Sequence, residues 1–304
     1  MGIIQAIVYG IIQGLTEFLP ISSTAHLRIF PALVGWPDPG AAFTAIIQLG
    51  TVAAVIIYFG KDIKPAFLAW WNSLTGKKDY DQKEARLAWA VFIGTLPAVV
   101  FGLLLQHKIE TTFRSLNIIG ASLIFLGFVM LAAEKMGAHK RKVDDVDVKD
   151  GVIVGFWQCL ALVPGMSRSG TTISGALFQK FDRVAAARFS FLLSIPAVAG
   201  AGLYEGFKAV REGKAPQQVG ESAADFAARQ IHWGPTIVAT VVSFIVGYAA
   251  IAFFLQYLQK RGIGVFVWYR VALGVILLLL VQQGVIDKNA GAKPDKQTAT
   301  AQTQ

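Results

Sequence analysis

The sequence predicts an all-α integral membrane protein built as an inverted-topology repeat, each half with one re-entrant helical hairpin plus three transmembrane helices. Three observations lead to this prediction. First, the 304 residues are 54% hydrophobic and only 15% charged, with a mean hydropathy of +0.53, whereas soluble domains carry about 25% charged residues. Second, two apolar segments are interrupted by proline and hydroxyl residues. Third, the two halves of the chain resemble each other.

Six apolar segments are long enough to cross a bilayer, which takes about 17–25 residues. Most of them contain glycine or proline, and membrane helices tolerate both because neighbouring helices satisfy the freed backbone groups. We expect the six spans near residues 42–60, 88–105, 116–134, 185–204, 236–257 and 264–282.

Two further apolar segments, 3–29 and 151–178, are too interrupted to span the bilayer. The first is apolar to Leu15 and then reads TEFLPISSTAH, and the second is apolar to Val163 and then reads PGMSRSGTT. Polar, broken backbone at membrane depth is tolerated only when it is buried in protein or lines a water-filled cavity. We therefore expect each segment to be a re-entrant hairpin, with a turn near the middle of the membrane.

An internal repeat of about 145 residues relates the two halves. GIIQGLTEFLPISS from Gly10 aligns with GFWQCLALVPGMSRS from Gly155, and AFTAIIQLGTV from Ala42 aligns with RFSFLLSIPAV from Arg188. Because three spans per repeat is an odd number, the second repeat must be inverted in the membrane. We expect one membrane domain over 1–286, with repeat one at about 3–134 and repeat two at about 152–282, followed by a polar, disordered tail over 287–304.

The basic residues set the orientation of this repeat. Sixteen of the 28 Lys and Arg lie in the segments 61–87, 135–151, 179–188 and 258–263, and ten lie in the segments on the other side. Cytoplasmic loops carry the excess of Lys and Arg, so both termini are expected outside and the two hairpin tips near the midplane. Inverted repeats with broken helices build central sites in this way. The loops account for the net charge of +9, so no nucleic-acid partner is expected.

The first hairpin tip carries a carboxylate, a hydroxyl and an imidazole. Gln13 and Glu17 are four residues apart and share a helix face. A carboxylate such as Glu17 is costly in a bilayer and marks a functional site. Ser23 and His26 are three apart, which suits a hydroxyl nucleophile with an adjacent base. The alternatives are that Ser23 caps a helix, that Gln13 joins two helices, and that His26 is a buried imidazole with satisfied hydrogen bonds.

The second tip, PGMSRSGTT, is built for an anion. A helix is expected to begin there, and helix N-termini bind anions, while the planar fork of Arg168 suits phosphate oxygens. The alternative is that Arg168 pairs with Glu17. Arg270, near the inner end of its span, is expected to snorkel to the interface. The candidate phosphate ligands of this tip are Arg168, Ser167, Ser169, Gly170 and Thr172.

Together these residues suit phosphoryl transfer, which depends mainly on positioning and charge neutralisation. A carboxylate at the tip can also hold a divalent cation against phosphate oxygens. The rival reading is a transporter of an anion or a lipid phosphate, which the inverted repeat favours but which needs no Ser–His pair. A structural membrane subunit leaves Glu17, His26 and Arg168 unexplained.

QGLTEFLPISSTAH (13–26) and PGMSRSGTT (164–172) resemble the two signature motifs of the bacterial undecaprenyl-pyrophosphate phosphatase family, the bacitracin-resistance type. The resemblance covers most of the chain, through QCLALVPGMSRSG and RFSFLLSIP. It implies hydrolysis of undecaprenyl pyrophosphate to undecaprenyl phosphate, which recycles the cell-wall lipid carrier and confers bacitracin resistance. It also implies a multi-pass protein of the bacterial inner membrane with its active site on the periplasmic side. A homodimer is compatible with it.

The resemblance assigns roles residue by residue. Glu17 helps to bind Mg²⁺ or Ca²⁺, and Gln13 occupies the other metal-motif position, where it contributes no charge. The pyrophosphate is held by Arg168 with the hydroxyls of the second motif. Ser23 is the expected nucleophile with His26 as its base, and His26 is the other candidate nucleophile. The expected catalytic residues are Ser23, His26, Glu17 and Arg168.

Overall fold

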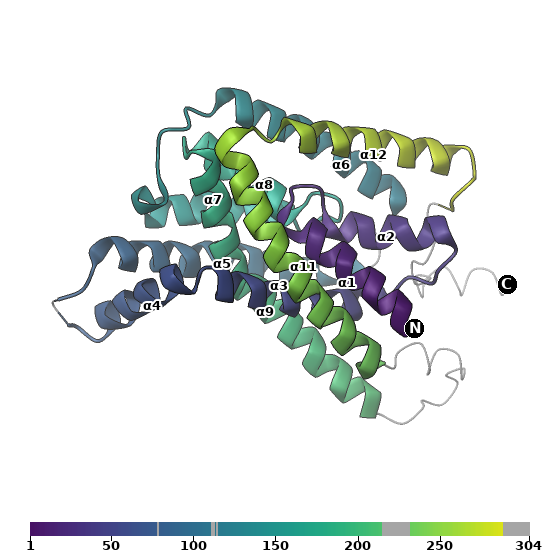
Figure 1. Ribbon diagram of the computed structural model, residues 1–304, viewed down its shortest axis with the longest axis horizontal. Helices are drawn as coiled ribbons and strands as arrows, with labels where there is room; N and C mark the ends of the chain where they lie inside the picture. The colour runs from purple at the N-terminus through teal and green to yellow at the C-terminus, as the bar shows by residue number, and fades with distance from the viewer. Residues whose placement is uncertain (78, 111–112, 114, 215–231, 288–304) are drawn as a thin grey trace.

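The computed structural model describes residues 1–77, 79–110, 113, 115–214 and 232–287. Within these residues the chain forms helices and no strand, which confirms the all-α class (Figure 1). Of the predicted polar tail, only Asp287 is described, so the prediction for 288–304 lies outside the described residues.

In the described part of the chain, six helices are long and apolar enough to cross a bilayer, as predicted from the sequence. Two of them, α5 and α9, extend furthest beyond the expected spans, because the polar residues that flank the apolar core continue the same helix. The six are α3 (Gly40–Tyr58), α5 (Gln82–Glu110), α6 (Leu116–Met136), α9 (Arg183–Lys214), α11 (Trp233–Lys260) and α12 (Gly264–Gln282).

The loop expected over 61–87 is largely helical. It contains α4 (Gly60–Leu74), which packs against α5. The Trp70 ring stacks on the ring of Phe92, with centroids 4.5 Å apart. Aromatic pairs of this kind stabilise packing by about 0.5–1.5 kcal/mol beyond the area that they bury, and this contact holds α4 along the span that follows it.

The two interrupted segments each form two helices joined by a turn. The first consists of α1 (Ile3–Phe18) and α2 (Ser23–Val34), and the second of α7 (Val148–Leu160) and α8 (Arg168–Phe178). Helix α1 packs against α11, and α7 packs against α5. Both contacts use glycine: an added Cβ would lie 2.8 Å from the Gly247 nitrogen at Gly14, and would collide with the Gly94 backbone at Gly155. Small residues allow membrane helices this close approach.

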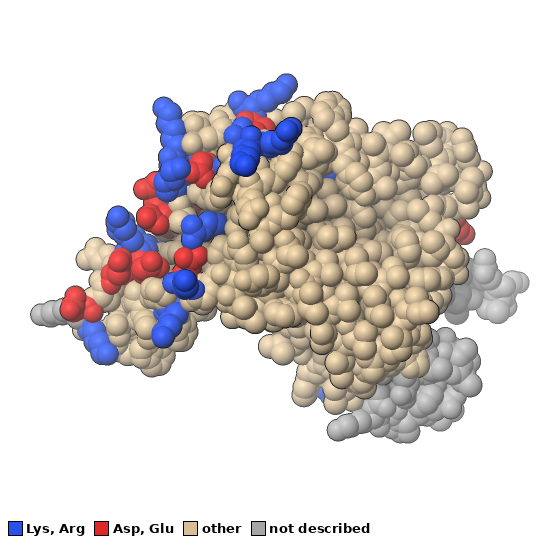
Figure 2. Space-filling view, viewed as in Figure 1, with Lys and Arg blue, Asp and Glu red and all other residues tan. Residues whose placement is uncertain are grey.

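Charged residues gather at one end of the molecule. Figure 2 shows Lys, Arg, Asp and Glu concentrated at the end that holds the α4–α5 connection and the segment between α6 and α7. The start of α1 and the end of α12 lie at the opposite end (Figure 1). A band of uncharged surface between a charged end and the chain termini is the arrangement of a multi-pass membrane protein.

Candidate active site

The two turns share one local geometry. Ser22 caps α2 and Ser167 caps α8, and each hydroxyl accepts a hydrogen bond from a backbone N–H three residues later, Ala25 at 3.3 Å and Gly170 at 3.2 Å. Such caps satisfy N–H groups that a helix start leaves unpaired. Both serines have positive φ, 74° and 61°, a strained conformation that clusters at functional sites. The alternative that Ser23 caps its helix is wrong, because its neighbour does.

Glu17 joins the two turns. Ser23 and Arg168 are the first residues of α2 and α8. The Ser23 hydroxyl donates to Glu17 Oε2 at 2.7 Å, and Arg168 Nη2 donates to Glu17 Oε1 at 2.9 Å. Gln13 Nε2 also donates to Oε2, at 2.9 Å. The Glu17 residue is only 7% exposed, so this carboxylate, its serine and its arginine form a nearly buried unit.

Arg168 keeps donors for a further partner. Its ion pair with Glu17 confirms one of the two readings left open by the sequence. Its Nη1 donates to the Ser190 carbonyl at 3.2 Å. Its Nε is buried without a hydrogen-bond partner. A buried donor without a partner is costly, and a phosphate oxygen is the acceptor that an arginine fork fits best.

The hydroxyls predicted to hold phosphate lie at this same turn, but they have protein partners. Ser169 Oγ donates to the Leu19 carbonyl at 3.2 Å and so ties the second turn to the first. Thr172 Oγ1 donates to the Arg168 carbonyl at 2.7 Å and lies 2.6 Å from Ser190 Oγ. Both are fully buried. In this state they position Arg168 and its turn.

His26 is engaged at both ring nitrogens. Because a carbonyl only accepts, Nδ1 donates to the Ser22 carbonyl, at 2.8 Å. This tautomer leaves the lone pair on Nε2, which lies 2.7 Å from the Tyr269 hydroxyl. The two rings stack, with centroids 5.7 Å apart and planes 4° from parallel. The Ser23 hydroxyl donates to Glu17 instead, so the geometry favours Glu17 over His26 as the base.

Arg270 is the main correction to the sequence reading. It does not snorkel to the interface but is 0% exposed, and its guanidinium donates to the carbonyls of Pro20, Gly165 and Leu123. These three carbonyls accept the hydrogen bonds that water would accept from an arginine at the membrane interface. Tyr269 beside it was also missed. The charge of Arg270 within an apolar span was the available signal, because such residues mark functional sites.

The site offers only a few oxygen ligands for a divalent cation. Gln13 Oε1 is buried without a partner, next to the Glu17 carboxylate, and oxygen atoms are the ligands that Mg²⁺ and Ca²⁺ prefer. Within the described part of the chain, no three or more His, Cys, Asp or Glu residues cluster as a metal site. The protein would thus supply two oxygens, and substrate phosphates and water the rest, as is usual for Mg²⁺.

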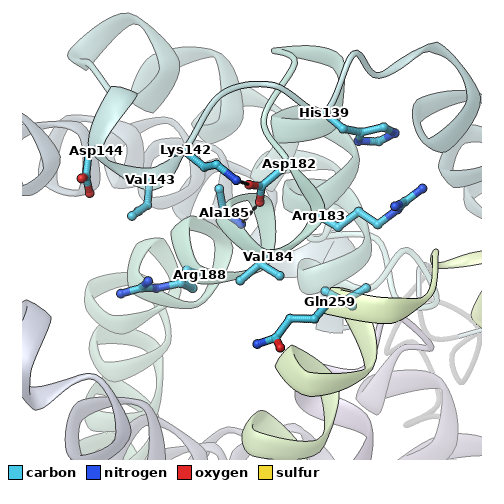
Figure 3. Close-up of a pocket in the computed structure, with 11 residues that line it drawn as sticks. His139, Lys142, Val143, Asp144, Asp182, Arg183, Val184, Ala185, Arg188 and Gln259 are labelled. Carbon is cyan, nitrogen blue, oxygen red and sulfur yellow. Dashed lines mark hydrogen bonds and ion pairs between the residues drawn. The ribbon is translucent and has the colours of Figure 1, made fainter.

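A pocket of about 590 Å³ is lined by residues of the segment between α6 and α7, of the start of α9 and of the end of α11 (Figure 3). Lys142 Nζ binds Asp182 at 2.6 Å beside it. Burial raises the pKa of the Asp182 carboxyl, but the Lys142 ammonium and backbone N–H groups lower it more, so the net shift is downward. No residue of the two turns lines this pocket, which therefore does not belong to the candidate site.

Comparison with known proteins agrees with these motifs. Residues 6–276 match the family model described as "Bacitracin resistance protein BacA". The chain is 51% identical over 294 residues to the "Undecaprenyl-diphosphatase" of Chloroherpeton thalassium, with 94% of this chain and 99% of that protein covered. It is 50% identical to the protein of the same name from Myxococcus xanthus, over 96% and 94% of the two chains. The chain belongs to the BacA bacitracin resistance protein family.

Proposed function

We propose that this protein is a membrane phosphatase that hydrolyses undecaprenyl pyrophosphate to undecaprenyl phosphate and inorganic phosphate. This reaction recycles the cell-wall lipid carrier and confers bacitracin resistance. The observation that carries the proposal is the meeting of Ser23 and Arg168 on Glu17, across 151 residues of sequence between Glu17 and Arg168. Relatives about 50% identical over nearly the whole chain are named undecaprenyl-diphosphatases.

In the first step, Arg168 exchanges the Glu17 carboxylate for the pyrophosphate of the substrate. In the free site its charge is balanced by Glu17 at 2.9 Å. When pyrophosphate enters, the unpaired Nε of Arg168 and its Nη groups donate to phosphate oxygens, because bidentate arginine–phosphate pairs are strong. Glu17 then loses its ion pair with Arg168, and its Oε2 still accepts the hydrogen bond from Ser23.

Ser23 is the nucleophile. Its Oγ attacks the terminal phosphorus while its proton passes to Glu17 Oε2, to which it already donates at 2.7 Å. The bond from phosphorus to the bridging oxygen breaks, and undecaprenyl phosphate leaves. Water then attacks the phosphoserine, Glu17 returns its proton to Ser23 Oγ and takes one from the water, and that proton leaves with the phosphate. His26 is held by Ser22 and Tyr269 and orders the first turn.

Glu17 and Gln13 are the residues that would hold Mg²⁺ or Ca²⁺, through a carboxylate oxygen and the unpaired Gln13 Oε1. A bound divalent cation supplies positive charge that neutralises phosphate oxygens. Arg168 performs the same task from the other turn, so the two turns share the work of balancing the substrate's charge.

The inverted repeat and re-entrant hairpins are part of the proposal. The matching serine caps of the two turns support the repeat, as does the packing of each half's first helix against the second span of the other half. The collection of charges at one end supports a cytoplasmic assignment for that end (Figure 2). With that end in the cytoplasm, we propose that the active site opens toward the periplasm.

Purified protein in detergent, incubated with undecaprenyl pyrophosphate, tests the proposal. The expected products are undecaprenyl phosphate and inorganic phosphate in equal amounts, followed by lipid mass spectrometry and phosphate assay. A transporter would bind the lipid and leave it intact. Recovery of unchanged substrate from monodisperse protein, with Mg²⁺ and with Ca²⁺ present, would reject the phosphatase in favour of transport.

A further inference from the structure

Arg270 lies in the second turn of α12 and contacts three separate segments. Its Nη1 donates to the Pro20 carbonyl at 3.0 Å, its Nη2 to the Gly165 carbonyl at 2.8 Å, and its Nε to the Leu123 carbonyl of α6 at 3.3 Å. A guanidinium has donors in a fixed planar fork. One side chain therefore fixes the first turn, the second turn and α6 relative to one another.

The two turn carbonyls that Arg270 holds occupy equivalent positions. Pro20 lies two residues before the cap of α2, and Gly165 lies two residues before the cap of α8. Each is three residues before the side chain that reaches Glu17, which is Ser23 in the first turn and Arg168 in the second. Arg270 thus binds each turn at a carbonyl three residues before the side chain that contacts Glu17.

The charge of Arg270 is also unbalanced within the site. Glu17 and Arg168 neutralise each other, and the hydrogen bonds recorded for Arg270 in the described structure all go to carbonyls. A Cβ added to Gly170 would lie 3.2 Å from Arg270 Nη1, so the guanidinium borders the first turn of α8. A buried cation without a counter-charge is costly, and an anion at that helix start would offset the cost.

We propose that Arg270 is a positioning residue of the site, which clamps the two turns in the register that brings Ser23 and Arg168 onto Glu17, and whose unbalanced charge strengthens pyrophosphate binding. The clamp part of this proposal rests on the phosphatase function, whereas the charge part does not. The clamp acts on turnover, because it places the nucleophile. The charge acts on affinity, because it is felt by any pyrophosphate at the start of α8.

Two substitutions separate the two halves. Arg270→Lys keeps the charge but replaces the fork by one nitrogen, so it should lower kcat roughly tenfold to a hundredfold, the loss of about one charge-assisted hydrogen bond, with KM changed less than threefold. Arg270→Gln removes the charge as well, so KM should rise too. Arg183→Gln, which removes an arginine paired to Glu134 at the charged end, is the matched control and should leave both constants unchanged.

Binding of inorganic pyrophosphate provides a readout that needs no turnover. In a Ser23→Ala background, pyrophosphate should raise the melting temperature, and adding Arg270→Gln should reduce that shift while Arg270→Lys preserves it. If wild-type protein proves inactive, this measurement still decides whether the charge of Arg270 strengthens pyrophosphate binding. Arg270→Lys with wild-type kcat, or Arg270→Gln with an undiminished pyrophosphate shift, would overturn the proposal. Should Arg270→Gln fail to fold, the kcat of Arg270→Lys still decides the clamp, and Arg270→Met in the Ser23→Ala background decides the effect of the charge on pyrophosphate binding.

Discussion

Replacing Glu17 by Gln should separate the roles of this carboxylate as base and as counter-charge. The Glu17 and Arg168 side chains are 6% and 13% exposed and lie 2.9 Å apart. Removing one partner of a buried pair leaves the other charge uncompensated, at a cost of about 3–5 kcal/mol. Arg168 keeps its bond to the Ser190 carbonyl, and glutamine still offers an acceptor, so we expect the free energy of unfolding to fall by about 3 kcal/mol, the lower end.

The effect on turnover should be larger. Ser23 donates to Glu17 Oε2 at 2.7 Å, and glutamine cannot take its proton. Loss of a general base slows reactions about 10²–10⁴-fold, so phosphate release in detergent should fall by that factor. Glu134→Gln makes the same chemical change outside the two turns, where Glu134 pairs with Arg183, so it is the matched control and should leave turnover unchanged.

A double variant tells the two roles apart. Glu17→Gln combined with Arg168→Gln removes both charges, so it should regain most of the lost stability, measured by denaturant titration in mixed micelles, and none of the activity. If Glu17→Gln turns over within threefold of wild type, the assignment of Glu17 as base is wrong. If its stability is unchanged while activity falls, the pair makes no net contribution to folding and only the catalytic role stands.

Four further outcomes are expected. Ser23→Ala should abolish phosphate release in a folded protein, and residual turnover above a thousandth of wild type would point to another nucleophile. Tyr269→Phe removes one neutral hydrogen bond to His26, about 0.5–1.5 kcal/mol, and should lower kcat about twofold to tenfold with KM unchanged; an unchanged kcat would make Tyr269 dispensable. Gln13→Glu should remain active and reach half-maximal activity at a lower Mg²⁺ concentration than wild type. In a cysteine-free background, an impermeant thiol reagent should label a cysteine at Lys293 but not at Lys77 in cells with a permeable outer membrane, and the reverse pattern would invert the proposed topology.

The sequence predicts the helices of this protein well because the bilayer simplifies the signal. A spanning helix must be apolar over a fixed length, so composition alone places all six. Helix α4 was missed, because the lysines and the proline of Gly60–Leu74 are typical of a loop. What holds this helix is the stacking of the Trp70 ring on the Phe92 ring. That contact is tertiary and leaves no periodic signal in either segment.

The sequence singles out candidate residues of the site, but it suggests only one of the contacts that the structure shows between them, the ion pair of Arg168 with Glu17. Glu17 and Arg168 stand out because charges are rare at membrane depth, and their ion pair was one of two readings. Spacing alone put His26 beside Ser23, whereas the turn of the backbone at Ser22, with φ of 74°, directs the Ser23 hydroxyl to Glu17 and the imidazole to Tyr269. Arg270 was misjudged because snorkelling is the usual fate of arginine near a span's end, and the carbonyls that hold it come from distant turns.

Phosphate release from undecaprenyl pyrophosphate should be compared for purified wild-type protein, Ser23→Ala, Arg168→Lys and Arg183→Lys, each monodisperse and at the same concentration. We expect one phosphate per lipid phosphate from wild type and Arg183→Lys, and none from Ser23→Ala. Arg168→Lys should be roughly tenfold to hundredfold slower, because it loses the planar fork that contacts Glu17 and is proposed to bind phosphate. Equal rates from all four proteins, or no release from wild type, would contradict the claim that the joined turns form a phosphatase site.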